Sequence, residues 1–280
     1  MAIIGFWSGS NKETGQTLSI ASVAVEMALK HNYKILLIDA TFDDDTMERC
    51  FFTVDKRNDV VKKLNKGKLD ISSGIEGLLS AVASNKTTPE IIKNFTRVIF
   101  KDRLDILCGL KTKSPEEFTN ALIHYNDLVK QANKYYDMVF IDMEKTLRYG
   151  TTKLLLEVSD IIVYDITNNQ KQRDEYLEYL EKYPEILKKE KIIPLLSNSD
   201  ENTVYNSRNI TRCIGEKKEI AYIPYDSSFV RSACEGLVDD YFKRNFLNPY
   251  KADKDVAFIN SVDNICKNIV KRLEELKYKV

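Results

Sequence analysis

Short apolar runs alternate along the chain with segments whose apolar positions recur at helical spacing. The first run is Ile3–Trp7, and after a polar loop apolar residues recur every three or four positions as far as His31. The run is typical of a strand buried on both faces, and the spacing is typical of a helix with one apolar face. Seven segments show the strand pattern: residues 3–7, 34–39, 104–108, 137–142, 161–164, 192–196 and 220–223.

Helical spacing separates most of these strands and continues to the end of the chain. The best-marked helix start is Ser114-Pro115-Glu116-Glu117, with Ser as the N-cap, Pro at the first helical position and Glu at the third. The apolar positions after it predict one continuous helix as far as Ala132. Other helices are expected over residues 20–31, 46–65, 74–84, 170–188, 203–214, 227–236 and 256–277.

This order of strands and helices predicts the fold class. Strands that alternate with helices indicate a doubly wound α/β fold, in which helices cover both faces of a mostly parallel sheet. No Pro/Gly/Ser-rich linker, change of composition or internal repeat divides the 280 residues. We therefore expect one domain over residues 1–280, a length that fits a large α/β domain.

Composition excludes several classes of protein. The chain has 42 basic and 42 acidic residues and is 43% hydrophobic, which argues against disorder and against a generally basic nucleic-acid binder. No run approaches the about 18–20 apolar residues of a membrane span, and the N-terminus lacks the basic start of a secretory signal. The five cysteines are scattered and the two histidines cannot build a metal centre by themselves. These features predict a cytoplasmic protein with reduced thiols.

The segment between the first strand and the first helix, Ser8–Leu18, lies where a phosphate-binding loop is found in nucleotide-binding proteins. That motif is G-x-x-x-x-G-K-[ST], and its backbone N–H groups hold phosphate oxygens. Gly15-Gln16-Thr17 matches its last three positions except that Gln replaces Lys, and Ser10 stands where the first Gly belongs. A polar turn with Gly is also common at helix starts, so the segment alone leaves both interpretations open.

Two carboxylates strengthen the nucleotide interpretation. Asp39 ends the second strand and Asp142 ends a later one. In a doubly wound sheet the carboxyl ends of the central strands meet beside the first loop, where carboxylates hold magnesium or orient water. An Asp at a strand end also serves as a helix cap or turn former. The Gly15-Gln16-Thr17 segment, Asp39 and Asp142 stand where a nucleotide site has its loop and its two carboxylates, and together they favour such a site.

With KILLIDA at the second strand, YYDMVFIDM at the later one and the segment IPYDSSFVRSACEG near the end, the chain resembles the MinD/ParA superfamily of deviant-Walker ATPases. This superfamily includes the CpaE- and TadZ-type localisation proteins. The resemblance runs from the first strand to Gly236. It implies a P-loop fold, ATP or ADP with Mg²⁺ as cofactors, and a homodimer. It also implies a role with an unidentified protein partner in positioning or regulating a pilus, a secretion or conjugation apparatus, or a DNA cargo.

The resemblance also implies roles for individual residues. Thr17 would ligate magnesium, with Asp39 and Asp142 as the other residues of the metal site, and Asp39 would assist catalysis. Asn198 stands where the family has an Asn that contacts adenine, and Pro224–Tyr225 would pass the base. The complete nucleotide-binding set is Ser10, Asn11, Lys12, Glu13, Thr14, Gly15, Gln16, Thr17, Leu18, Asn198, Pro224 and Tyr225.

The chain departs from the family at the residues that supply charge. The family loop is K-G-G-x-G-K-T; its first Lys falls on Asn11 here, with Lys12 beside it as a candidate catalytic cation. Its second Lys is Gln16, and the family's Asp-x-Asp reads Asp39-Ala40-Thr41. Losing one such electrostatic contact costs about 10²–10³ in rate. We therefore expect nucleotide binding with slow or absent hydrolysis; the alternative is a non-catalytic scaffold on the same fold.

Three other functions are disfavoured by the sequence. A tyrosine-kinase relative on this fold would carry a Tyr-rich tail, which the chain lacks. Nucleic-acid contact through Lys188-Lys189-Glu190-Lys191 is possible but not favoured in a chain without net positive charge. The last helix could target a membrane, but its narrow aliphatic stripe favours docking on the core; the stripe is Ile259, Val262, Ile265, Ile269, Leu273 and Leu276.

Overall fold

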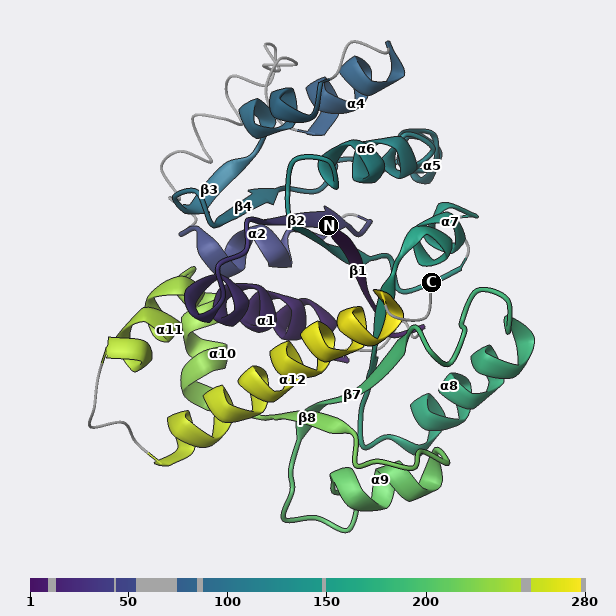
Figure 1. The fold of residues 1–280 in the computed structure, drawn as a ribbon, viewed down its shortest axis with the longest axis vertical. Helices are drawn as coiled ribbons and strands as arrows, with labels where there is room; N and C mark the ends of the chain where they lie inside the picture. Colours follow the sequence, from purple (N-terminus) through teal and green to yellow (C-terminus); the bar gives the residue numbers. More distant parts are fainter. Residues whose placement is uncertain are drawn as a thin grey trace.

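One eight-stranded sheet organises the protein (Figure 1). The computed structural model describes residues 1–9, 14–42, 44–53, 75–84, 88–147, 150–247 and 253–277. The strand order is β3-β4-β2-β5-β1-β6-β7-β8, and every neighbouring pair is parallel except β3 with β4. The strands are β1 (Ala2–Trp7), β2 (Ile35–Ala40), β3 (Arg97–Phe100), β4 (Leu104–Leu107), β5 (Met138–Met143), β6 (Ile161–Ile166), β7 (Ile192–Ser199) and β8 (Ala221–Pro224). The predicted doubly wound α/β fold is confirmed.

Alternate residues of each central strand face two separate hydrophobic cores. In β1, Ile4 and Phe6 belong to one core, while Ile3 and Trp7 belong to the other. Because both faces are covered, the strands are apolar throughout rather than alternating. The first core is completed by α1 (Gln16–Lys30), α2 (Thr46–Phe51), α10 (Ser227–Cys234), α11 (Val238–Leu247) and α12 (Asp253–Lys277). The second is completed by α4 (Ile75–Ala83), the 3-10 helix η1 (Pro89–Phe95), α5 (Pro115–Leu122), α6 (Tyr125–Ala132), α7 (Gly150–Val158), α8 (Gln170–Lys182) and α9 (Ser207–Cys213).

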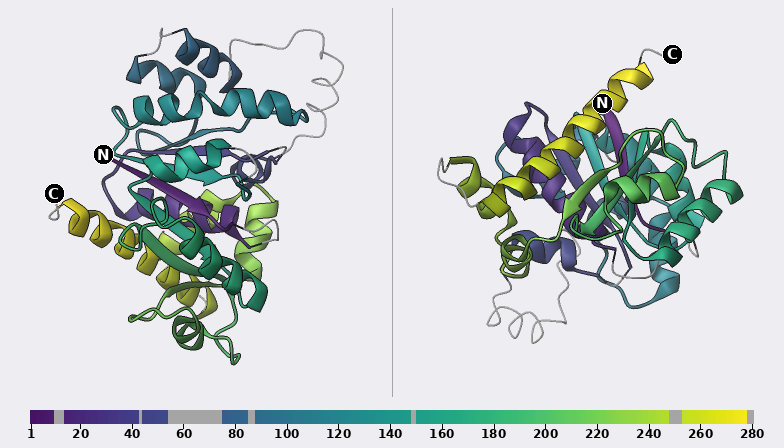
Figure 2. Two further views of the ribbon diagram at one scale, coloured as in Figure 1. Left: turned by 90° about the vertical axis from the view of Figure 1, so that its right-hand side faces the viewer. Right: turned by 90° about the horizontal axis from the view of Figure 1, so that it is seen from below.

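The last helix, α12, lies across one face of the sheet beside α1 (Figures 1 and 2). Its residues Val262, Ile265 and Ile269 are fully buried in the first core. The apolar stripe therefore packs on the protein, as the sequence indicated. No helix in the described ranges is both long enough and apolar enough to cross a membrane.

The predicted helix over residues 115–132 is wrong in one respect: it is two helices. The backbone N–H of His124 donates to the carbonyl of Ala121, only three residues back, so the chain tightens between α5 and α6. Ile123 is left 59% exposed at this break. The apolar period continues across the turn because both helices face the same core, which is why periodicity could not reveal the break.

Other differences concern elements that the sequence pattern did not mark. Strand β3 and helices α7 and α11 were not predicted, and β7 continues beyond residue 196 to Ser199. The helix expected over residues 46–65 ends at Phe51 in α2, and residues 54–65 lie outside the described part of the chain. β3 carries only four residues, and its first two are exposed, so it lacks the buried run that marks the central strands.

Gly236 ends α10 in a left-handed conformation against the end of α2. Its φ is +74°, and a Cβ there would lie 2.6 Å from the carbonyl carbon of Phe52. Gly215 has a similar φ of +71° but no atom within 4 Å of the Cβ position, so it serves as a matched control. We expect Gly215→Ala to lower the free energy of unfolding by about 1 kcal/mol through backbone strain alone.

Gly236→Ala should lower the free energy of unfolding by about 1–3 kcal/mol more than Gly215→Ala does, because the backbone of Phe52 and Thr53 must also move. Urea unfolding of the two variants measures the difference. Equal losses of stability would show that the contact between α10 and α2 is not tight.

Candidate functional site

The candidate site begins where β1 passes into α1. Gly15 has φ +82° and is the N-cap of the helix, a position where glycine has no side chain to cap the first turn. The first turn carries no acidic residue. Its backbone N–H groups, which have no partner within the helix, and the positive end of the helix dipole can therefore bind an anion. The predicted loop residues Ser10, Asn11, Lys12 and Glu13 lie outside the described residues.

The next two residues bind the carboxylate at the end of β5. Gln16 donates from Nε2 to Asp142 Oδ1 at 2.6 Å and to the carbonyl of Met143 at 2.8 Å. Thr17 donates from Oγ1 to Asp142 Oδ2 at 2.8 Å. Each carboxylate oxygen therefore has one donor, and all three side chains are buried. Hydrogen bonds to a charged group contribute about 1.5–3 kcal/mol each, so these contacts hold the start of α1 against β5.

Asp39 and Asp142 lie opposite each other on the paired strands β2 and β5. Burial raises the pKa of Asp39 to about 8, and the charge of Asp142 adds to the effect. Hydrogen bonds from the hydroxyl and backbone N–H of Thr41, at 2.6 and 3.0 Å, oppose it only in part. Burial also raises the pKa of Asp142, to about 6, against the donors Gln16 and Thr17. Of the two carboxyl groups, Asp39 therefore has the more strongly raised pKa and keeps its proton to higher pH.

The loop after β4 encloses Asp39. A Cβ at Gly109 would lie 2.9 Å from Cγ and Oδ2 of Asp39, so a larger residue there would collide with the carboxyl group. Tyr125 of α6 donates its hydroxyl to the carbonyl of Asp39 at 3.3 Å. Sequence reasoning missed both residues, because neither belongs to a motif and each reaches the site only through the fold.

Asn198, Pro224 and Tyr225 lie together at the ends of β7 and β8. The backbone N–H of Tyr225 donates to the carbonyl of Ser199 at 3.1 Å, and Pro224 is the strand partner of Ser199. Asn198 has φ +52°, and its Nδ2 lies 3.1 Å from the Cβ position of Gly15. Asn198 is therefore beside the start of α1, and Tyr225 is 61% exposed next to it.

A third buried carboxylate, Asp165, lies at the end of β6. Ser197 donates its hydroxyl to Asp165, and the hydroxyls of Ser197 and Ser19 are 3.0 Å apart. Burial raises the pKa of Asp165 to about 7. The sequence analysis ended this strand at Tyr164 and missed Asp165, although it ends an apolar run as Asp39 and Asp142 do. It also missed Lys145, whose positive charge partly offsets the rise in the pKa of Asp142.

The described residues fit a magnesium-bound phosphate group. Thr14 Oγ1 and Gln16 Oε1 are buried beside the helix start without a hydrogen-bond partner in the described chain. Thr17 and Asp142 present adjacent oxygens, and magnesium in phosphate sites is held by only one or two protein groups together with phosphate and water. Among the residues described, no three His, Cys, Asp or Glu side chains are grouped to hold a metal without such a ligand.

The raised pKa of Asp39 makes stability depend on pH. Its usual value is 3.8 and its folded value about 8, so between these pH values the folded chain keeps a proton that the unfolded chain releases. Stability from this group is therefore full at low pH and is lost as the pH rises through about 8. We expect Asp39→Asn, measured in the presence of a chelator, to reduce this loss of stability. Between about pH 5 and 8, the slope of the unfolding free energy against pH should become shallower by up to about 1.4 kcal/mol per pH unit.

Urea unfolding across this pH range measures the slope. Asp200→Asn, at an exposed turn after β7, is the control and should leave the slope unchanged. An Asp39→Asn slope equal to that of the starting protein would contradict the protonated state of Asp39.

Solved structures of ParA and MinD proteins share this fold. A ParA family ATPase from Chlorobium tepidum TLS superposes with a TM-score of 0.71 at 16% identity, covering 95% of this chain and 98% of that one. The septum site-determining protein MinD of Pyrococcus horikoshii OT3, complexed with Mg-ADP, gives 0.65 at 17%, covering 97% and 98%. The MinC:MinD complex of Aquifex aeolicus gives 0.64 at 14%, covering 95% of each chain.

No protein-family model and no curated protein sequence matches the chain. The likeness is therefore one of structure, and at these identities it shows the fold alone. Over nearly its full length, the chain has the α/β fold of the ParA and MinD ATPases.

Proposed function

We propose that the protein binds ATP or ADP with Mg²⁺ at the start of α1 and dimerises with nucleotide at the interface. It would thereby position or regulate a larger assembly in the cytoplasm through an unidentified protein partner. The observation that supports this most directly is the start of α1, with glycine at its N-cap, beside the hydrogen-bonded pair Thr17 and Asp142. The structurally similar Pyrococcus horikoshii MinD is complexed with Mg-ADP.

Each residue of the site has a proposed role. The loop Ser10–Leu18 would hold the phosphates through its backbone N–H groups, and Lys12 would supply a positive charge. Thr17 and Asp142 would hold magnesium, which neutralises phosphate charge when bound. Asn198 and the Pro224–Tyr225 segment would contact the base, because Asn198 lies beside Gly15 and the segment is paired with the neighbouring Ser199.

Slow or absent hydrolysis follows from the contacts of Gln16. Its Nε2 is 2.6 Å from Asp142 and 2.8 Å from the carbonyl of Met143, so the amide keeps the shape of the site but supplies no cation. Phosphoryl transfer depends on positive charge placed on the transferred group. Asp39 would assist catalysis from a buried position that raises its pKa to about 8.

The alternative is a scaffold that keeps the fold without turning over nucleotide. The same Gln16–Asp142 contact supports it, because an uncharged amide satisfies Asp142 and brings no cation to the site. The Aquifex aeolicus structure shows MinD in a complex with MinC, so this fold can present a surface to another protein. Nucleotide binding and phosphate release distinguish the two candidates.

Removing the Thr17 hydroxyl should weaken binding of Mg-ATP. Thr17→Ala removes the donor to Asp142 and the proposed magnesium ligand, while Thr17→Ser keeps the hydroxyl and is the matched control. We expect Thr17→Ala to raise the calorimetric dissociation constant at least about 10-fold, as the loss of one contact to a charged group would. Thr17→Ser should stay close to the starting protein, and chelator should abolish the difference.

Two results would contradict the proposal. One is that neither the starting protein nor Gln16→Lys binds Mg-ATP. The other is that Thr17→Ala and Thr17→Ser bind it equally well. If the protein binds Mg-ATP but releases no phosphate, the result agrees with both candidates. The Gln16→Lys variant, which restores a cation at this position, then distinguishes them.

Restoring a lysine should raise hydrolysis. We expect Gln16→Lys to release phosphate from Mg-ATP at least about 10-fold faster than the starting protein, because a positioned cation lowers the barrier. Gln16→Met removes the amide donors without adding charge and should remain slow. A gain in Gln16→Lys over a silent starting protein would favour the scaffold candidate.

Loss of activity in Lys12→Ala, from a starting protein that already hydrolyses ATP, would identify Lys12 as the missing cation. If Gln16→Met accelerates release as much as Gln16→Lys, charge is not the cause of slow turnover.

A further inference from the structure

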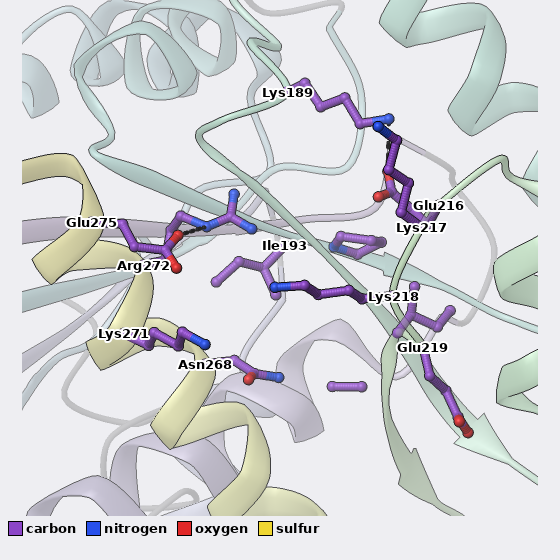
Figure 3. Close-up of a pocket in the computed structure, with 13 residues that line it drawn as sticks. Lys189, Ile193, Glu216, Lys217, Lys218, Glu219, Asn268, Lys271, Arg272 and Glu275 are labelled. Atoms are coloured by element: carbon purple, nitrogen blue, oxygen red, sulfur yellow. Dashed lines mark ion pairs between the residues drawn. The ribbon is translucent and has the colours of Figure 1, made fainter. Parts of the chain in front are cut away.

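A second hollow lies at the opposite end of the sheet from the candidate nucleotide site. Its cavity of about 520 Å³ is bounded by the start of β7, the 215–220 loop that leads into β8, and the second half of α12 (Figure 3). The nucleotide site is at the carboxyl ends of the strands, whereas this cavity is at the amino ends of β7 and β8. The two sites therefore share no residue.

Positive charge in this cavity is not balanced by its own carboxylates. Glu216 is 3.4 Å from Lys189, and Glu275 is 3.5 Å from Arg272. The third carboxylate, Glu219, is 3.3 Å from Arg208 outside the cavity and also accepts a hydrogen bond from Ser207. All three acidic residues of the lining are thus already paired.

Three lining lysines, Lys217, Lys218 and Lys271, make no ion pair within the described chain. All three line the same cavity, in a protein whose total charge is zero. Figure 3 shows Lys218 and Arg272 directed into the hollow from opposite sides. Three uncompensated ammonium groups in one concave site select an anionic partner.

The floor of the cavity is fixed rather than loose. Arg272 Nη1 donates to the carbonyls of Glu190 and Ile192 at 2.8 and 3.2 Å, which anchors this guanidinium to the start of β7. The apolar part of the lining comes from Pro194, which is half-buried, and from Ile193, Ile220 and Ala221, which are 4–6% exposed. A partner that fits therefore offers negative charge and a small apolar contact.

The shape favours an extended chain over a compact small molecule. A second hollow of about 370 Å³ adjoins the first and shares Lys189, Pro194, Glu216, Arg272 and Glu275 with it. The first hollow reaches the start of β8, which is the edge strand of the sheet. Peptides dock at such edges through their main chain, with pockets for alternate side chains.

We propose that this groove, between the 215–220 loop, the start of β7 and α12, binds a short peptide segment of a partner protein in which acidic and apolar residues alternate. The acidic side chains meet Lys217, Lys218 and Lys271, and the apolar ones rest on the strand residues. A nucleic-acid duplex presents a convex row of phosphates with few accessible apolar groups, so it matches mainly the charged part of the lining. This proposal is independent of nucleotide binding at the other end of the sheet.

A random octapeptide library displayed on phage tests the groove without knowledge of the partner. We expect selection on the full chain, without nucleotide, to enrich peptides with two or more acidic residues and at least one large apolar residue. Lys218→Glu combined with Lys271→Glu should lose this enrichment. The matched control combines Lys130→Glu with Lys134→Glu, two exposed lysines at α6 that make no ion pair in the described chain.

The most enriched peptide, labelled with fluorescein, is then measured by anisotropy. We expect the groove variant to weaken its binding at least about 10-fold and the control variant to leave it within about twofold. Lys218→Gln with Lys271→Gln, which adds no negative charge, should also weaken it. Circular dichroism melting shows whether each variant is folded, and the Gln pair decides the outcome if the Glu pair is not.

Three results would overturn the proposal. One is selection without acidic enrichment. Another is equal weakening by the groove and control variants, which would indicate non-specific charge attraction. The third is tighter binding of a short labelled DNA duplex than of any selected peptide, lost in the groove variant, which would assign the groove to nucleic acid.

Discussion

The hydrogen-bonded link from Asp142 to Gln16 and Thr17 is the contact on which the candidate site depends. It joins the carboxyl end of β5 to the first turn of α1, and it is wholly buried. A buried carboxylate without donors would cost several kcal/mol, on the order of the full desolvation of the group. The two donors therefore keep Asp142 in place, and with it the position of the helix start that faces the loop.

The same link shows what the Gln16 amide contributes to the fold. An amide satisfies Asp142 by hydrogen bonding, where an ammonium would add a positive charge at the same place. Three buried carboxyl groups, Asp39, Asp142 and Asp165, lie near the carboxyl ends of the central strands, and burial raises the pKa of each. An anionic nucleotide in such surroundings depends on magnesium and on backbone N–H groups for its charge balance.

The sequence predicted the parts of the structure that depend on local pattern. Apolar runs located β1, β2 and β5, and their carboxyl ends placed Asp39 opposite Asp142, as the strand pairing shows. The predictions that were wrong concern features that depend on tertiary contacts. The break at Ile123–His124 is invisible because both helices keep one apolar face.

Residues that approach the site from distant elements were also missed. Gly109 matters because the loop after β4 closes over Asp39, and Tyr125 matters because α6 packs above the same residue. Neither follows from spacing along the chain. Asn198 was placed by resemblance to a family, and its contact with Gly15 comes from the fold.

The two ends of the sheet separate two kinds of chemistry. Acidic side chains lie beside a helix start at one end, and lysines without an ion pair among the described residues lie beside the strands at the other. The central claim concerns the first. A crystal structure of the protein with saturating Mg²⁺ and a non-hydrolysable ATP analogue tests it most directly. The account predicts phosphates at the start of α1, magnesium beside Thr17 and Asp142, and the Gln16 amide still on Asp142. A loop without nucleotide under these conditions, or nucleotide bound elsewhere, would contradict it.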